Sequence, residues 1–217
     1  LEQDKKLAFK EGIDILFNPN DHFILKKKKS FKLGDISKKL CGSFRKGHFE
    51  GVSAVVIEFL NLINPDLILL GEKDFQQTIV IKKIIKNLDF KVKVKMIPTV
   101  RDKNDVALSS RNKLLGTDSS LAVLIPKTLN QMIKEIKNGN FKFSRIDELK
   151  SNLIDNGIQK VDYLEILKEK DLNFPDSQFD FCRVFISAKI NGIRLIDNMR
   201  LNKKVKISNE KFFVERN

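Results

Sequence analysis

Residues 65–86, PDLILLGEKDFQQTIVIKKIIK, decide the fold of the region around them. They begin with a short apolar run, residues 65–70, of the kind that forms a buried strand in a parallel sheet. They end with residues 78–86, in which apolar and basic side chains recur at helical spacing. Between the two, a glycine turn over residues 71–77 is expected to carry a lysine, an aspartate and two glutamines to the carboxyl end of the strand and the start of the helix. Ligands bind at that place in open α/β sheets, and a helix N-terminus there favours phosphate, so we predict a site.

A second polar segment follows a short distance downstream. Residues 91–97, KVKVKMI, alternate with period two and predict the next strand, which Pro98 ends. Residues 108–112, LSSRN, then offer two hydroxyls and a guanidinium, which together suit an anion with several oxygen acceptors. The alternative is a helix N-cap followed by an exposed arginine. Lys73 and Asp74 could likewise be a surface ion pair near a helix start.

Taken in order, these segments resemble the pantothenate synthetases, also called pantoate–β-alanine ligases. The matching segments are residues 71–77 (GEKDFQQ), 98–101 (PTVR), 107–112 (ALSSRN), 45–52 (RKGHFEGV) and 194–198 (RLIDN). Several short motifs in a fixed order are far more specific than any one of them. Lys46 stands where the family usually has proline.

The resemblance implies a two-step reaction. The carboxylate of pantoate would attack the α-phosphorus of ATP, releasing pyrophosphate and leaving a pantoyl-adenylate. The amine of β-alanine would then attack that anhydride and give pantothenate and AMP. Such a reaction needs positioning and charge neutralisation more than acids and bases, and Mg²⁺ would share the phosphate charge. A related adenylyl-transferring enzyme that uses another acid is the alternative, and the family further implies a homodimer built through the first domain.

The resemblance also implies roles for individual residues. Lys73 and Arg111 would be the catalytic pair, and Gln77 would bind pantoate. The ATP-binding residues would be Gly71, Glu72, Lys73, Asp74, Val100, Leu108, Ser109, Ser110 and Arg111. Within that set Gly71 would permit close backbone approach and Asp74 would orient Lys73 or hold the ribose. The backbone at Val100 would contact adenine, and the segment from Leu108 to Arg111 would close over the triphosphate.

Four further residues lie in the matching segments. Arg45 and His48 could line the pantoate side or a closing loop. Alternatively, His48 could be a turn residue that is hydrogen-bonded only to backbone. Asp197 and Asn198 are expected to set hairpin register and to cap, without a part in catalysis. We predict no protein-built metal site.

The family's His-x-Gly-His loop has no counterpart here. The sequence contains only His22 and His48, neither of them in that spacing. Residues 1–7 already have the pattern of a helix interior, and they resemble the family's helix that precedes the strand at residues 13–17. We therefore expect an N-terminally incomplete chain whose first strands are missing. Such a chain would have little ligase activity by itself and would expose a sheet edge and apolar surface.

Composition adds one rival function. The formal net charge is +13 and the pI is about 9.6, as in many nucleic-acid binders. Yet the lysines are spread along the chain, with one run at residues 26–29, and a lone tyrosine with no tryptophan leaves little for base stacking. We expect no nucleic-acid partner.

Cys41 and Cys182 stand without metal or redox spacing, which suits a cytoplasmic enzyme. Charged residues interrupt every candidate membrane span.

The pattern predicts an α/β fold: a Rossmann-like, nucleotidyltransferase-type parallel sheet followed by a smaller α+β domain. The domains would be residues 1–98, which bind nucleotide and pantoate, and residues 99–217, which form a lid. Predicted helices are residues 1–11, 35–40, 51–64, 78–86, 121–138 and 143–156, with a turn at 47–51. Predicted strands are residues 13–17, 30–33 (an edge strand), 65–70, 91–97, 161–167, 183–190 and 193–199. Asn191-Gly192 predicts a hairpin between the last two strands, and the tail 202–217 is expected to fray.

Overall fold

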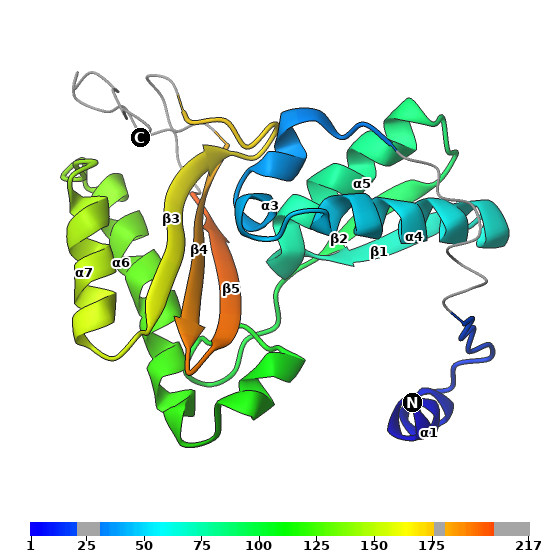
Figure 1. Ribbon diagram of the computed structural model, residues 1–217, viewed down its shortest axis with the longest axis horizontal. Coiled ribbons are helices and arrows are strands. Elements are labelled where there is room, and N and C mark those ends of the chain that lie inside the picture. The colour runs from blue at the N-terminus through cyan, green and yellow to red at the C-terminus, as the bar shows by residue number, and fades with distance from the viewer. Residues whose placement is uncertain (21–30, 176–180, 202–217) are drawn as a thin grey trace.

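The structure is a computed structural model that describes residues 1–20, 31–175 and 181–201 (Figure 1). Two α/β halves lie side by side, each with its own sheet. The helices are α1 (Glu2–Lys10), α3 (Cys41–Phe44), α4 (His48–Ile63), α5 (Phe75–Asn87), α6 (Leu124–Lys137) and α7 (Arg145–Asp155), with 3-10 helices η1 (Gly34–Lys38), η2 (Glu72–Asp74) and η3 (Ser110–Val123). The strands are β1 (Leu67–Gly71), β2 (Lys93–Ile97), β3 (Lys160–Lys168), β4 (Cys182–Ile190) and β5 (Ile193–Arg200).

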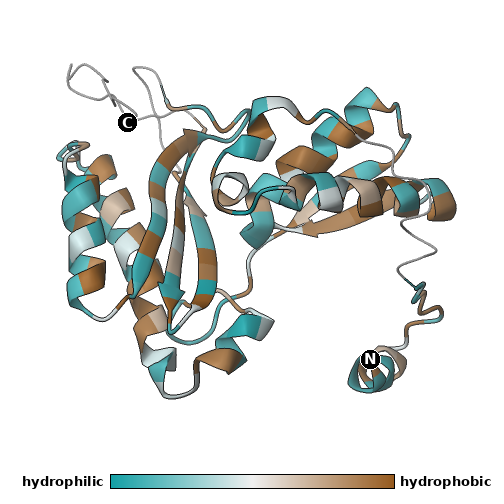
Figure 2. Ribbon diagram, in the orientation of Figure 1, coloured by the Kyte–Doolittle hydropathy of each residue, from teal (hydrophilic) through white to brown (hydrophobic). Residues whose placement is uncertain are grey.

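The first half is built on the parallel pair β1 and β2, which α5 connects. The register runs from Leu67 opposite Lys93 to Gly71 opposite Ile97. One face of this pair packs against α4 and α5 through a small apolar cluster that includes Leu60, Ile81 and Ile85. The strand–helix–strand order predicted for residues 65–97 is therefore confirmed. On the other face Leu67 and Leu69 are exposed. Strand β1 is therefore apolar along its length, and Figure 2 shows it in brown.

The second half is an antiparallel sheet with the strand order β3-β4-β5. Helices α6 and α7 cover one face of this sheet and form the largest apolar cluster with it (Figure 1). Asn191 and Gly192 join β4 to β5 with positive φ angles of 47° and 76°, the backbone that a tight hairpin turn requires. The predicted hairpin is thus confirmed.

The other face of the antiparallel sheet packs against the first half. Tyr163 and Phe185 from that sheet belong to one apolar cluster with Phe49 and Phe75, the first side chain of α5. The rings of Phe75 and Phe185 are 5.8 Å apart between centroids. The same packing brings the turn after β1 beside β5, where Asn198 donates to the carbonyl oxygens of Glu72 and Lys73. The division into two domains at residue 98 stays a prediction.

Two predicted strands are absent from the described residues. Residues 13–17 form no strand, and Ile15 has 83% of its surface exposed. The local pattern is that of a strand, but a strand needs a partner, and none lies beside this segment in the described chain. Of the other predicted strand, residues 30–33, Ser30 lies outside the described residues, and the other three residues are irregular.

Several boundaries also differ from those predicted. The predicted helix at 35–40 is η1 followed by the short α3. The predicted turn at 47–51 is wrong because His48 already begins α4, with Gly47 as a left-handed N-cap at φ 75°. Gly71 is likewise no glycine turn. It ends β1 at φ −71° and ψ 131°, and the chain turns through η2 instead.

Some expectations fall outside the described residues. They concern His22, the lysine run at residues 26–29 and the tail at 202–217. Among the described residues, no helix has the length and apolar character needed to cross a bilayer.

Candidate active site

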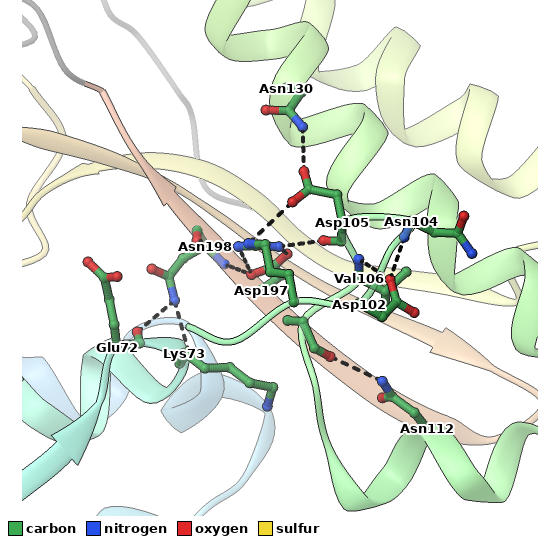
Figure 3. A network of polar contacts seen from close by, with 12 residues as sticks. Glu72, Lys73, Asp102, Asn104, Asp105, Val106, Asn112, Asn130, Asp197 and Asn198 are labelled. Atoms are coloured by element: carbon green, nitrogen blue, oxygen red, sulfur yellow. Dashed lines mark hydrogen bonds and ion pairs between the residues drawn. The ribbon is translucent and has the colours of Figure 1, made fainter. Parts of the chain in front are cut away.

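The turn after β1 carries Lys73 and is anchored from the other half of the molecule. The side-chain amide nitrogen of Asn198, in β5, donates to the carbonyl oxygens of Glu72 at 3.1 Å and Lys73 at 2.9 Å. Figure 3 shows this amide directed at the turn, with the Lys73 side chain extending away from it. Among the described residues the Lys73 ammonium has no ion-pair partner, and no ion pair joins it to Asp74. The surface ion pair considered from sequence is therefore wrong.

The Ser109–Arg111 segment lies at the start of η3. The Ser109 hydroxyl accepts a hydrogen bond from the backbone N–H of Arg111 at 3.2 Å, so Ser109 is the N-cap of this helix. Arg111 is exposed and donates to the backbone oxygen of Arg194 at 3.3 Å. The N-cap interpretation is confirmed, and it is compatible with a site because the cap uses only the Arg111 backbone N–H and leaves its guanidinium to other contacts.

A cavity of about 340 Å³ lies between the two halves. It brings together most of the residues that the sequence singled out: Arg45, His48, Lys73, Asp74, Gln77, Ser109, Ser110 and Arg111. Lys73 from the first half and Arg111 from the second thus line the same cavity. The structure adds lining residues that the sequence did not assign to the site, among them Gln76, Tyr163, Arg194, Asp197 and Asn198.

Four of the predicted ATP-binding residues do not line this cavity. Gly71 lies in β1, and a Cβ added there would meet no atom within 4 Å. The Glu72 carboxylate accepts from the buried Arg183 guanidinium at 2.6 Å, which gives it a structural partner. Val100 and Leu108 are exposed and bonded to each other, since the Leu108 N–H donates to the Val100 carbonyl at 2.9 Å. That carbonyl is therefore already occupied.

The charges around the cavity are predominantly positive. Arg194 is paired through Nε with Asp162 at 2.7 Å, and Asp197 receives a bidentate contact from Arg101 at 2.7 and 2.9 Å. Burial raises the pKa of the Asp197 carboxyl, although Arg101 opposes that shift. With these pairs neutralised, the cationic groups of Arg45, Lys73 and Arg111 face the cavity with no carboxylate paired to them in the described chain. Such an arrangement favours a ligand with several negative charges.

His48 is held as a neutral acceptor. Arg45 Nη1 lies 2.8 Å from His48 Nε2, and because an arginine can only donate, Nε2 must accept and the ring proton must be on Nδ1. Burial first, and then the charges of Arg45 and Arg111, lower the pKa of His48 below its ordinary value. His48 is therefore no turn residue bonded only to backbone.

We expect Arg45→Met to raise the pKa of His48, because it removes a positive charge while burial persists. An NMR titration of the imidazole protons measures this directly, and a His22→Gln variant assigns the second histidine. An unchanged pKa in Arg45→Met would show that the guanidinium does not act on His48.

The folded-state pKa of His48 lies below the unfolded one, so the contribution of His48 to stability is present at neutral pH. That contribution is lost as the pH falls through the folded-state pKa.

The two adjacent glutamines have different tasks. Gln76 is buried, and its side chain accepts from the Cys41 N–H at 3.1 Å and donates to the carbonyls of Ile36 at 2.9 Å and Lys39 at 2.6 Å. This amide fixes the segment that leads into α3. Gln77 also lines the cavity, and no side-chain bond occupies it in the described residues. The sequence resemblance singled out Gln77 for the site, but it gave no sign that Gln76 would hold backbone groups of the preceding segment.

The inner wall of the cavity is less polar. Cys41 Sγ and the Tyr163 hydroxyl are 3.2 Å apart there, and both side chains are buried. Burial raises the pKa of Tyr163 well above its ordinary value, so its hydroxyl stays protonated. The pattern of β3 predicted a strand but gave no sign that Tyr163 would reach a site.

Fold and cavity together define a two-part α/β protein with a predominantly cationic pocket between a parallel and an antiparallel sheet. The model of the pantoate-beta-alanine ligase family matches residues 1–200. The chain belongs to that family.

Its relatives carry the name pantothenate synthetase. That of Methylococcus capsulatus is 40% identical over 168 residues, covering 77% of this chain and 59% of the relative. That of Shewanella woodyi is 34% identical over 204 residues, covering 92% of this chain and 72% of the relative. The chain thus spans between about three fifths and three quarters of the length of these relatives.

Solved structures give the same family. Pantothenate synthetase from Thermus thermophilus superposes with a TM-score of 0.81 at 28% identity, covering 92% of this chain and 74% of that one. The enzyme from Francisella tularensis superposes with a TM-score of 0.68 at 29% identity, covering 93% and 70%. The latter is described as complexed with Beta-gamma ATP and Beta-alanine.

Proposed function

We propose that the cavity binds ATP and pantoate and that the protein acts in the AMP-forming condensation of pantoate with β-alanine, through a pantoyl-adenylate. The observation that carries this proposal is the convergence of Lys73 and Arg111, from different halves, on one cavity. Neither cation is paired with a carboxylate of the described residues. The parallel β1–α5–β2 unit supports a Rossmann-like nucleotide-binding half over residues 1–98. Residues 99–217 would be the smaller lid domain.

Each lining residue has a task in this proposal. Lys73 neutralises phosphate oxygens as a compact point charge, and Arg111 adds a planar pair of donors from the opposite side. Ser109 caps η3 and so directs the Arg111 backbone, while Ser110 offers an exposed hydroxyl. Holding the reacting carboxylate against the α-phosphorus accelerates the first step by positioning, since no acid or base is required.

Pantoate would lie beside Gln77, whose amide offers both donors and an acceptor. Arg45 and the neutral His48 line the same cavity, so they are placed to contact a carboxylate. The less polar inner wall at Cys41 and Tyr163 suits the aliphatic part of a small hydroxy acid.

Mg²⁺ fits this site only as a companion of the phosphates. No cluster of three metal-ligating side chains occurs in the described residues. Asp74 lines the cavity, and no ion pair engages its carboxylate within the part of the chain described here. Because Mg²⁺ keeps most of its waters and often uses one or two carboxylates with substrate phosphates, Asp74 would hold it. The ion would supply charge neutralisation at the phosphates.

The functional test is pyrophosphate exchange into ATP in the presence of different acids. We expect pantoate to support more exchange than acids without its hydroxyl groups. Equal exchange with every acid would support an adenylyl-transferring enzyme of another specificity. Salt-dependent binding to DNA or RNA without affinity for ATP would contradict the proposal and favour a basic binding module. Homodimer formation and a cytoplasmic location stay predictions.

Gln77→Leu is expected to weaken pantoate binding about tenfold while leaving ATP affinity unchanged, because it removes neutral hydrogen bonds to one substrate only. Calorimetric titration of each substrate measures the two affinities separately. Gln76→Leu is the matched comparison, which should instead lower the free energy of unfolding by about 3 kcal/mol, since buried carbonyl and N–H groups lose their partners. Loss of ATP affinity in Gln77→Leu would contradict the assignment of this side chain to pantoate.

A further inference from the structure

We propose that Asn198 is a positioning residue that sets the direction of the Lys73 side chain toward the phosphates. The inference rests on the proposed function, because it concerns how the cationic cavity is assembled. Asn198 lies in β5, 125 residues further along the chain than Lys73, and only 3% of its surface is exposed.

The side-chain amide of Asn198 bonds to the backbone of the turn on both sides of Lys73. Asn198 Nδ2 donates to two consecutive carbonyl oxygens, those of Glu72 and Lys73, at 3.1 and 2.9 Å. These are the peptide groups on either side of the Lys73 Cα. Fixing both planes fixes the direction in which Lys73 leaves the backbone. The turn itself is a single 3-10 helix of three residues without a side-chain cap, so local bonds hold it poorly.

The orientation of the Asn198 amide is itself determined. Its Oδ1 accepts from Arg183 Nη1 at 2.5 Å, and because arginine has no acceptor, oxygen must face Arg183 and nitrogen must face the turn. The Asn198 backbone N–H donates to Asp197 Oδ1 at 2.8 Å, and Arg101 binds the same carboxylate. Arg183 thus fixes the Asn198 side chain, and the Asp197 carboxylate fixes its backbone N–H.

These bonds separate a positioning role from direct contact with a ligand. Asn198 borders the cavity, but both Nδ2 hydrogens are used by the turn and Oδ1 is used by Arg183. A substitution at this position therefore changes phosphate binding through Lys73. Its effect should vanish when the Lys73 ammonium is absent.

The experiment is a double-mutant cycle on the affinity for a non-hydrolysable ATP analogue, measured by titration calorimetry. Asn198→Ala removes the amide without adding charge. Asn198→Thr is the second variant, because it also adds no charge, suits a β-strand, and keeps a hydroxyl oxygen as a neutral acceptor beside Arg183. Each is made in the unaltered chain and in Lys73→Met. Asn156→Ala is the matched control, since that side chain also donates to a backbone carbonyl, at 2.7 Å, but at the C-cap of α7 and not at the cavity.

We expect either Asn198 substitution to lower the affinity for the analogue about tenfold in the otherwise unaltered chain. In Lys73→Met the same substitution should lower it less than about threefold. Asn156→Ala should bind as the unaltered chain does. An equal loss of affinity with and without Lys73 would overturn the proposal and leave Asn198 a purely structural residue. An unchanged affinity in the Asn198 variants would overturn it as well. Absence of analogue binding by the unaltered chain is a different result, since it would overturn the proposed function itself.

Discussion

Arg183→Met is expected to lower the free energy of unfolding by about 3–5 kcal/mol, the usual cost of removing one partner from a buried ion pair. Arg183 is 2% exposed, and its guanidinium contacts Glu72 at 2.6 Å and Glu169 at 3.0 Å. Methionine would still fill space beside the Phe75 ring, but the cation–π contact of the guanidinium carbon, 4.4 Å from the ring centroid, would be lost. The Glu72 carboxylate, however, would lose its one ion-pair partner among the described residues, and Glu169 would keep only Arg200, at 2.8 Å.

Urea denaturation at neutral pH measures this loss. Arg145→Met is the matched comparison, because Arg145 pairs with Glu135 at 3.4 Å in a more exposed position on the surface of the second half. Its urea midpoint should move far less. Arg183→Lys should rescue little, since an ammonium cannot reach both carboxylates and Asn198 with a planar set of donors. Equal midpoints for Arg183→Met and Arg145→Met would contradict the account of this buried cluster.

Lys73→Met is expected to lower the rate of pyrophosphate exchange by a factor of about 10²–10³, as removal of one preformed charge at a reacting phosphate commonly does. The methionine side chain is of similar length and keeps the backbone contacts to Asn198. The free energy of unfolding should therefore be nearly unchanged. Lys82→Met, on the exposed side of α5, is the comparison for a lost surface lysine and should retain the full rate. A Lys73→Met protein with the exchange rate of the unaltered chain would exclude Lys73 from the chemistry.

Local pattern was sufficient for the elements whose cause is local. The strand–helix–strand order at residues 65–97, the helices that became α4, α6 and α7, and the hairpin at Asn191-Gly192 all followed from periodicity or turn chemistry. The strand at residues 13–17 failed because its pattern says nothing about whether a neighbouring strand exists to pair with it. Strand pairing is a long-range property.

Only part of the site could be predicted, because some of its contacts are also long-range. Motif order identified Lys73, Gln77 and Arg111, and the fold places all three at one cavity. It could not show that Glu72, in the same motif, turns to Arg183, a residue 111 positions away. A buried arginine in a strand leaves no periodic mark in the sequence. The contacts of Asn198 could not be predicted for this reason as well, since its partners become neighbours only when the two halves pack together.

The most direct test of the central claim is calorimetric titration of the non-hydrolysable ATP analogue into three proteins: the unaltered chain, Lys73→Met and Arg111→Met. If residues from the two halves converge on one triphosphate, each variant should bind the analogue at least about tenfold more weakly than the unaltered chain does. Added salt should lower the affinity of the unaltered chain more than that of either variant. The account is contradicted if either variant binds the analogue as tightly as the unaltered chain does, because Lys73 and Arg111 would then not share a ligand.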